Sequence, residues 1–426
     1  MPLTLGVLAT LLVACSSTAS KAPTTSGSKS TIPPAAFRGT TGLTATTVNV
    51  GNVSTLTAGL FKGAPVGLQA YVDYVNSQGG VNGRKIVVDG ADDGYANGAN
   101  NKALTQADIA KDFAMVGSFS LNDSYGGQVL AVNPAVPNVT VSLSTFTNNL
   151  PNTFSPAPTP GGWQLGPLVY FQKKYPADMA HVGALVADQP SAIAAFNGEK
   201  AAMGHLGLKL VYDPTFEITT TDFTPYVVNM EKAGVKILFI EQMPENYAAA
   251  VIKAMNQQNF HPIVVLGAST YSEALVGAAG GPAAVNGDYL AQAYSLYLGE
   301  DTTLPAADLF LKWVQTASPG FKPDLYTLYG WISGELFVQA LRAAGKNPTR
   351  GSVLQALRSI TAFSAGNLIA GVNPAGKVPA SCYLIGQYVS GTFTRVDDPP
   401  INGSSGGYRC DQPYYYPPGV AKPAGA

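Results

Sequence analysis

The chain has 426 residues, of which 46% are hydrophobic, and this length and composition allow more than one buried core. Only 12% of the residues are charged and the net charge is -1, so no cluster of Lys and Arg is available to neutralise nucleic-acid phosphates. The sequence contains no Gly-x-Ser-x-Gly elbow and no phosphate-binding loop, and its histidines, His181, His205 and His261, show no metal-ligand spacing. We therefore expect neither an enzyme nor a nucleic-acid-binding protein, and neither a cofactor nor a metal ion.

The N-terminus begins with an uncharged apolar run, MPLTLGVLATLLVAC. The run is shorter than the roughly 20 residues of a membrane span but fits the apolar core of an export signal. Its end, Leu12-Val13-Ala14-Cys15, resembles the bacterial lipoprotein box, which implies lipidation of Cys15, although no Lys or Arg precedes the run. A buried helix with a chance cysteine is the alternative. Residues 16–43 are rich in Ser, Thr and Pro without periodicity, so they predict a disordered tether to the outer face of the cytoplasmic membrane.

The folded part alternates short apolar strands with helical patterns. Strands are predicted at 47–53, 85–88, 113–117, 138–143, 181–187, 208–212, 235–240, 262–267, 288–297, 382–389 and 392–396. Helices are predicted at 66–75, 97–112, 122–133, 162–174, 191–206, 222–233, 245–258, 306–317, 324–344 and 350–360. This alternation is typical of parallel sheets with crossover helices, and the uniformly apolar strands indicate sheets covered on both faces.

Two segments interrupt this rhythm. Residues 155–162 contain too much proline for a helix or a sheet interior, and Gly280-Gly281-Pro282 precedes the strand at 288–297. The stretch 397–426 is rich in Pro, Gly and Tyr and is expected to be irregular. We interpret the two interruptions as the places where the chain crosses between two bodies.

Besides Cys15, the sequence contains only Cys382 and Cys410. In an exported chain this even remainder suggests a disulfide, which would contribute roughly 3 kcal/mol through loop entropy. Two free buried thiols are the alternative.

Four segments resemble one known family. Val75–Ile86 (VNSQGGVNGRKI), followed by Asp92-Asp93, is similar to a motif of branched-chain amino-acid-binding proteins of the Leu/Ile/Val type. Val116–Ser120, Thr221–Pro225 and Lys232–Phe239 are also similar to segments of these proteins, although Lys236 stands where an Asp is usual. The resemblance covers about residues 46–396 and identifies the chain as a type I periplasmic binding protein, the substrate-binding component of ABC transporters.

The resemblance implies an α/β fold with two Rossmann-like lobes, parallel sheets, a three-strand hinge and a ligand cleft between the lobes. The third crossing is expected near Ala362–Leu368. The expected division is a signal peptide (1–15), a tether (16–43), an N-terminal lobe (44–158 plus 293–364), a C-terminal lobe (159–292 plus 365–412) and an irregular tail (413–426). The implied function is capture of an amino acid, amide or organic acid by lobe closure, with delivery by a monomer to an ABC permease. A sensor that reports to a membrane signalling protein is the alternative.

Ligands of open α/β sheets bind beyond the carboxyl ends of the strands, and this rule selects the candidate site. In the first lobe the candidates are Ser54, Thr55, Phe61, Ser118, Phe119, Ser120, Leu121, Ser144, Thr145 and Phe146, and in the second Asp188, Gln189, Glu241, Gln242, Ser269 and Tyr271. The resemblance implies that the loops 118–121 and 144–146 bind a ligand carboxylate through hydroxyl and backbone N–H groups.

Two departures from the family put amino-acid binding in question. Ser269 stands where the family usually has an acidic residue for the ligand ammonium, so Glu241 is the candidate replacement, and Asp188-Gln189 replaces the usual Tyr-Gly. The simpler interpretations are helix N-caps for the Ser and Thr residues, a solvated strand end for Glu241, and core positions for Tyr329 and Trp331.

Overall fold

A computed structural model describes residues 31–95, 97–397 and 407–426. The predicted signal peptide, Cys15 and residues 16–30 of the predicted tether lie outside these ranges. Within them, no helix is both long and apolar enough to cross a membrane.

The first sheet has five strands in the order β2-β1-β3-β4-β5, and all neighbouring strands are parallel. They are β1 (Thr47–Ser54), β2 (Lys85–Asp92), β3 (Ala114–Val116), β4 (Asn138–Val139) and β5 (Thr153–Phe154). The strand β3 is buried at every residue, as expected for a sheet covered on both faces.

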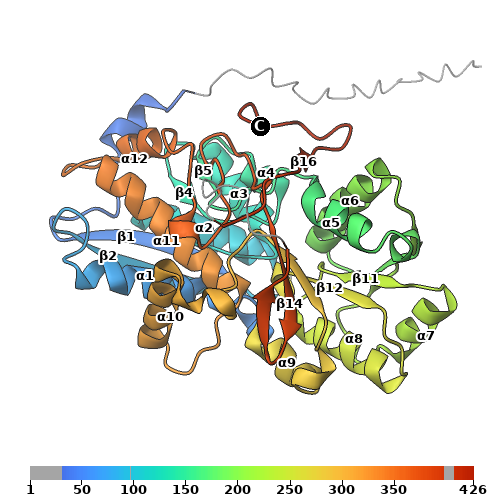
Figure 1. Cartoon of the computed structure of the whole chain (residues 1–426). Coiled ribbons are helices and arrows are strands. Elements are labelled where there is room, and N and C mark those ends of the chain that lie inside the picture. The colour runs from blue at the N-terminus through green and yellow to red at the C-terminus, as the bar shows by residue number, and fades with distance from the viewer. Residues whose placement is uncertain (1–30, 96, 398–406) are drawn as a thin grey trace, which may run out of the picture. The chain divides into compact units, whose positions relative to one another are not determined.

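The second sheet has seven strands in the order β15-β14-β13-β12-β11-β7-β9. They are β7 (Val182–Ala184), β9 (Leu210–Tyr212), β11 (Ile237–Ile240), β12 (Ile263–Gly267), β13 (Tyr289–Gln292), β14 (Leu384–Val389) and β15 (Thr392–Arg395). The pairs β13–β14 and β14–β15 are antiparallel and the other pairs are parallel. Figure 1 labels β11, β12 and β14 of this sheet. Two short pairs accompany it: β8 (Val186–Ala187) with β10 (Thr215–Phe216), and β6 (Trp163–Gln164) with β16 (Tyr414–Tyr415).

Helices connect most of the strands. They are α1 (Gly63–Ser77), α2 (Gly98–Lys111), α3 (Asp123–Val132), α4 (Thr145–Asn148), α5 (Leu165–Lys174), α6 (Pro190–His205), α7 (Thr224–Lys232), α8 (Glu245–Gln257), α9 (Glu273–Ala279), α10 (Pro305–Ala317), α11 (Leu325–Ala343) and α12 (Arg350–Leu357). Short 3-10 turns lie at Pro34–Arg38, Thr57–Gly59, Asp178–Ala180, Ala268–Thr270, Pro282–Ala284, Glu300–Thr303 and Ala365–Asn367. The helices α10 and α11 pack against α1, so the chain returns to the first sheet after β13.

The predicted α/β alternation is confirmed, with several local differences. The short strands β5, β6 and β10 were not predicted. The strand at 138–143 is only two residues long, and the strand at 288–297 ends at Gln292. The helices α4 and α9 were not predicted. Tyr414-Tyr415, in the stretch expected to be irregular, forms β16 by pairing with β6.

Three segments connect the two sheets. The first is the proline-rich stretch 155–162 between β5 and β6, and the second follows β13. The third follows α12 and runs beside the second, because Tyr294 forms an antiparallel bridge with Ile369. Farther along the third segment, the Lys377 ammonium donates hydrogen bonds to the backbone carbonyls of Asn148, Leu150 and Thr153, from the end of α4 to the start of β5, at distances of 2.6–2.9 Å. These contacts fix the third segment to the edge of the first sheet.

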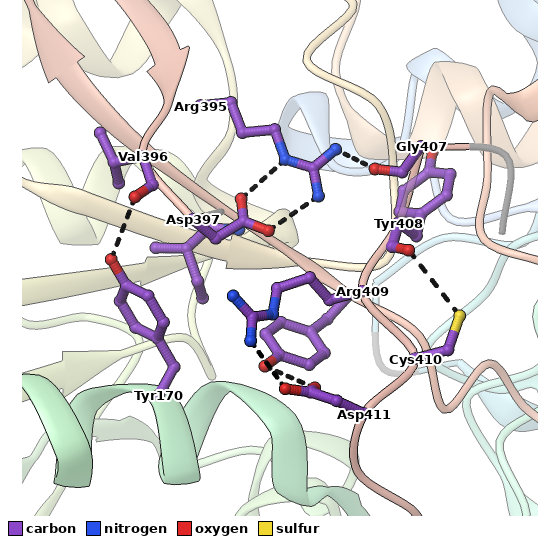
Figure 2. Close-up of polar contacts among 11 residues, drawn as sticks. Tyr170, Arg395, Val396, Asp397, Gly407, Tyr408, Arg409, Cys410 and Asp411 are labelled. Atoms are coloured by element: carbon purple, nitrogen blue, oxygen red, sulfur yellow. Dashed lines mark hydrogen bonds and ion pairs between the residues drawn. The ribbon is translucent and has the colours of Figure 1, made fainter. Parts of the chain in front are cut away.

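The C-terminal segment is joined to the second sheet by a hydrogen bond from the Arg395 guanidinium (Figure 2). Nε and Nη2 of Arg395 donate to the Asp397 carboxylate at 2.8 and 2.7 Å, and Nη1 of Arg395 donates to the Gly407 carbonyl. The Arg409 guanidinium lies 2.7 Å from the Asp411 carboxylate. Cys382 and Cys410 are joined by a disulfide, with 4.3 Å between their Cα atoms. The segment that leads to β16 is therefore fixed beside the start of β14.

Candidate functional site

A cavity of about 370 Å³ lies at the carboxyl ends of strands from both sheets and beside the three connecting segments. This volume is within the range of small-molecule sites. The first sheet and α11 contribute Phe119, Val141, Ser142, Leu143, Thr145, Leu325, Tyr326 and Tyr329. The second sheet and α6 contribute Ser191, Ala194, Ala195, Glu241, Gln242, Gly267, Ala268, Ser269, Ala291 and Gln292. The connecting segments, together with β6 and β16, contribute most of the remaining residues, including Thr159, Trp163, Gln164, Tyr294, Ile369, Val372 and Tyr414.

Five of the predicted site residues line this cavity: Phe119, Thr145, Glu241, Gln242 and Ser269. The Ser269 hydroxyl donates to the backbone carbonyls of Glu241 and Met243, at 2.6 and 3.0 Å. Ser269 therefore fixes the loop after β11, from which Glu241 extends.

Four predicted hydroxyl residues, Ser54, Thr55, Ser118 and Ser120, do not line the cavity. The Thr55 hydroxyl donates to the fully buried Asp93 carboxylate at 2.8 Å, and the Ser120 hydroxyl donates to the same carboxylate. Ser54 Oγ accepts from the Phe119 backbone N–H, and Ser118 Oγ accepts from the Val53 backbone N–H, both at 3.1 Å. These groups hold the loop that carries Phe119.

The second predicted carboxylate-binding loop is also used internally. Ser144 caps α4, because its hydroxyl accepts a hydrogen bond from the backbone N–H of Thr147. The Phe146 ring is 48% exposed and lies outside the cavity. The N-cap interpretation therefore describes the structural role of Ser144.

The other predicted residues lie around the cavity without lining it. Phe61 packs against Phe119 and Tyr326, with ring centroids 4.7 and 4.6 Å apart, and Leu121 packs against the same cluster. Tyr271 is buried, and its hydroxyl accepts from the Leu298 backbone N–H. Two further residues, Asp188 and Gln189, stand at the start of α6, with Asp188 exposed.

Tyrosines from α11 form an aromatic wall. The Tyr326 and Tyr329 rings lie 5.2 and 5.4 Å from the Phe119 ring, and the Tyr329 hydroxyl is 3.0 Å from that of Tyr294. Trp331 is buried at 1% exposure, as expected, but the core assignment of Tyr329 was wrong, because Tyr329 lines the cavity. The first turns of α11 point at the carboxyl end of the first sheet, which periodicity alone does not reveal.

Two lining residues that were not predicted carry polar atoms without partners in the described part of the chain. The Ser142 hydroxyl and Gln292 Oε1 are buried and have no hydrogen-bond partner among the described residues. The rule that ligands bind beyond strand ends selects both positions once the strand ends are correct, because β4 ends at Val139 and β13 at Gln292. The strand predictions that extended too far hid this signal.

Two carboxyl groups lie at the second-sheet side of the cavity. Glu241 follows β11, and the missing side chain of Gly267 leaves room for it, since a Cβ there would lie 2.8 Å from Glu241 Cβ. Glu199, on α6, is 1% exposed; its Oε2 accepts from the Gln242 amide at 3.4 Å, and its Oε1 has no partner in the described part of the chain. Burial raises the pKa of Glu199 to about 8. Burial, together with the charge of Glu199, raises the pKa of Glu241 well above its ordinary value.

The charge of the lining is one-sided. Among the described residues that line the cavity, none is Lys, Arg or His, and the single ionisable acid is Glu241. Of the buried lining atoms without a partner in the described part of the chain, Gln292 Oε1 can only accept a hydrogen bond, and the Ser142 hydroxyl can donate or accept. A guest that brings hydrogen-bond donors matches this lining better than an anion does.

The sequence from residue 47 to 392 matches the family model of periplasmic binding proteins. The chain belongs to this family. Membership in the family confirms the α/β solute-binding fold. This periplasmic binding protein is therefore a solute-binding protein that acts outside the cytoplasm. Its family consists of binding proteins and not of enzymes. No curated protein matches the sequence.

Solved structures share the fold of this periplasmic binding protein at low sequence identity. A fatty acid ABC transporter substrate-binding protein from Thermomonospora curvata has a TM-score of 0.68 and 20% identity, over 90% of this chain and 95% of that one. A solute-binding protein of an ABC transporter from R. palustris, in complex with 4-hydroxybenzoate, has a TM-score of 0.67 and 18% identity, over 83% and 96%. A leucine-binding protein from Thermotoga maritima has a TM-score of 0.66 and 16% identity, over 82% and 98%.

Proposed function

We propose that this protein captures a small organic solute in the cavity and delivers it to an ABC permease as a monomeric lipoprotein anchored through Cys15. The proposal is supported by family membership, by the cavity between the two sheets and by the apolar run that ends at Cys15. The two sheets with their helices act as lobes that close on the solute, with boundaries near those predicted from the sequence. Each lobe contributes part of the lining, so the bound solute favours the closed form.

The solute is an amine or amide with an apolar or aromatic body, and the charge of the lining carries this assignment. Glu241 lines the cavity, Glu199 lies buried next to it, and no described lining residue is cationic. A ligand carboxylate would require Glu241 to stay protonated and would find no cation among the described lining residues. An ammonium or amide N–H instead gains acceptors, and the rings of Tyr326 and Tyr329 accommodate an apolar body or a cation.

The proposal gives the predicted site residues two roles. Phe119, Thr145, Glu241, Gln242 and Ser269 surround the solute, together with the tyrosine wall. Ser54, Thr55, Ser118 and Ser120 hold the loop that carries Phe119.

The test compares ligands that share one body and differ in charge. We expect benzylamine and benzamide to raise the melting temperature of the full chain, and benzoate to leave it unchanged. At a hundredfold excess over Kd, binding adds about 2.7 kcal/mol to the free energy of unfolding. Calorimetric titration then provides the dissociation constants.

A variant pair tests the role of Glu241. Glu241→Gln should weaken benzylamine at least about tenfold, the equivalent of about 1.4 kcal/mol, and change benzamide binding less. Glu231→Gln, at an exposed position on α7, is the matched control and should change neither. Benzoate as the tightest ligand, or equal effects of the two variants, would contradict the assignment.

A further inference from the structure

Three aspartates form a cluster on the first sheet, away from the cavity lining. Asp89 lies on β2, Asp108 on α2, and Asp112 directly after α2. One carboxylate oxygen from each lies within 4.8 Å of the other two. In a chain with only 12% charged residues, such a concentration of acids needs a physical reason.

Two of these carboxylates are buried and incompletely paired. Asp108 is 3% and Asp112 is 2% exposed, and Oδ2 of each has no hydrogen-bond partner among the described residues. A buried carboxylate oxygen without a partner is costly, so the cluster lacks a cation or donor that would compensate for it.

The sheet is shaped to hold the cluster. Gly51 of β1 is paired with Asp89, and a Cβ at Gly51 would lie 2.8 Å from both Cβ and Oδ2 of Asp108. The absence of a side chain at Gly51 is therefore what allows Asp108 to lie against the sheet beside Asp89. The Asp89 side chain is 46% exposed, which leaves a path from solvent.

Two cations face the cluster and do not satisfy it. The Lys111 ammonium contacts Asp89 and lies 3.3 Å from Asp108 Oδ1, but its side chain is 51% exposed and free to turn outward. The Arg350 guanidinium donates to the backbone carbonyls of Ile109, Asp112 and Phe113, and no carboxylate accepts from it in the described part of the chain.

We propose that Asp89, Asp108 and Asp112 bind a calcium ion, with Lys111 as the internal cation that the metal displaces. Ligands that are all carboxylate oxygens select a hard cation such as Ca²⁺ over Zn²⁺ or Cu²⁺, and bound water completes the six to eight ligands that Ca²⁺ takes. The ion fixes the end of α2 to β2, so it stabilises the lobe and is separate from solute capture. Histidine and cysteine spacing in the sequence gives no sign of this triad.

The test uses the full chain freed of metal by EDTA and titrated with CaCl2. Extracellular sites of this kind bind at roughly 10⁻⁴–10⁻³ M, so the titration covers that range. We expect heat of binding and a rise of several degrees in the melting temperature, and NaCl at equal ionic strength should produce neither. Absence of the heat and the shift, or an equal shift with NaCl, overturns the proposal.

Variants separate a metal site from a merely repulsive cluster. Asp108→Asn and Asp112→Asn should abolish the response to Ca²⁺ while folding normally in EDTA, and Lys111→Met should bind Ca²⁺ more tightly than the parent. Asp308→Asn, at an exposed position on α10, is the control and should respond like the parent. An undiminished response in both Asp108→Asn and Asp112→Asn also overturns the proposal.

Discussion

Glu199 is a carboxyl group buried beside the cavity, with 1% of its surface exposed to water. Burial raises the pKa of Glu199 from an ordinary 4.5 to about 8, and the pKa of Glu241 beside it is also raised. Between pH 4.5 and pH 8, Glu199 of the folded chain holds a proton that Glu199 of the unfolded chain has released. The contribution of Glu199 to stability is therefore complete below about pH 4.5 and is lost as the pH rises toward 8.

This sign predicts a measurable effect of Glu199→Gln. Each proton held by the folded state changes the free energy of unfolding by up to about 1.4 kcal/mol per pH unit, so the stability of the ligand-free parent should fall between pH 5 and pH 8. Because its glutamine does not titrate, Glu199→Gln should show a smaller decrease in the free energy of unfolding between pH 5 and pH 8. Urea unfolding at several pH values measures this decrease.

Other buried acids also contribute to the fall in stability. The measured effect of Glu199 is therefore the difference in the free energy of unfolding between the variant and the parent at each pH. Burial raises the pKa of Asp288 to about 8 and that of Glu335 to about 7, and both remain in the variant. The exposed Glu231→Gln should keep the full slope of the parent. Parallel pH profiles for Glu199→Gln and Glu231→Gln would show that Glu199 is already ionised in the folded chain.

At the residue scale, the sequence predicted the loop residues but not their side-chain directions. Glu241 was found because it directly follows an apolar strand, and it lines the cavity. Thr55 and Ser120 also follow strands, yet both bind Asp93, because a buried carboxylate attracts the nearest hydroxyls. Glu199 was missed because it lies within a helix, where no pattern of neighbouring residues shows that it approaches Glu241.

At the scale of elements, the contact between α1 and α11 depends on two glycines. A Cβ at Gly67 would lie 1.8 Å from the Thr327 carbonyl oxygen, and one at Gly330 would lie 1.9 Å from that of Ala64. Glycine in a helix costs about 1 kcal/mol relative to alanine, so the pair is explained by the close approach of the two backbones. This approach places the first turns of α11, with Tyr326 and Tyr329, at the cavity.

Gly330→Ala should therefore destabilise the protein by about 3 kcal/mol, because the added methyl group collides with the α1 backbone at Ala64, which can move only together with the rest of the helix. Gly277→Ala on α9 is the matched control: a Cβ there meets nothing within 4 Å, and alanine should add about 0.5–1 kcal/mol. Thermal and urea unfolding should show a decrease in the free energy of unfolding for Gly330→Ala and an increase for Gly277→Ala. A neutral Gly330→Ala would mean that the helices lie farther apart.

Element type was easier to predict than element length. The apolar strand 235–240 and the helix 324–344 differ from β11 and α11 by two residues or fewer at each end. The strand predicted at 288–297 continues five residues beyond β13, because Ala293–Tyr297 is equally apolar but belongs to a connecting segment. Apolar composition indicates burial, and a connecting segment between two sheets is buried too.

At the scale of the whole molecule, the last residues of the chain return to the binding cavity. The segment after residue 406 is held by the contacts of Figure 2 and by the disulfide, pairs with β6, and places Tyr414 in the cavity lining. Its proline content argued for an irregular tail. The pairing of β16 with β6 joins residues about 250 apart in sequence, and no local pattern predicts such a contact.

Removing the disulfide should therefore affect both stability and binding. In Cys382→Ala/Cys410→Ala the free energy of unfolding should fall by about 3 kcal/mol, because the unfolded chain gains the freedom of a loop that the bond otherwise closes. The affinity for the solute should fall as well, since the segment that holds Tyr414 loses its covalent anchor. Tyr414→Ala in the disulfide-bonded chain separates the two effects: it should weaken binding severalfold, measured by calorimetry, with little change in unfolding. If the double variant keeps full affinity while Tyr414→Ala loses it, the hydrogen bond from Arg395 to Gly407 and the pairing of β16 with β6 are enough to hold the segment, and the disulfide serves stability only.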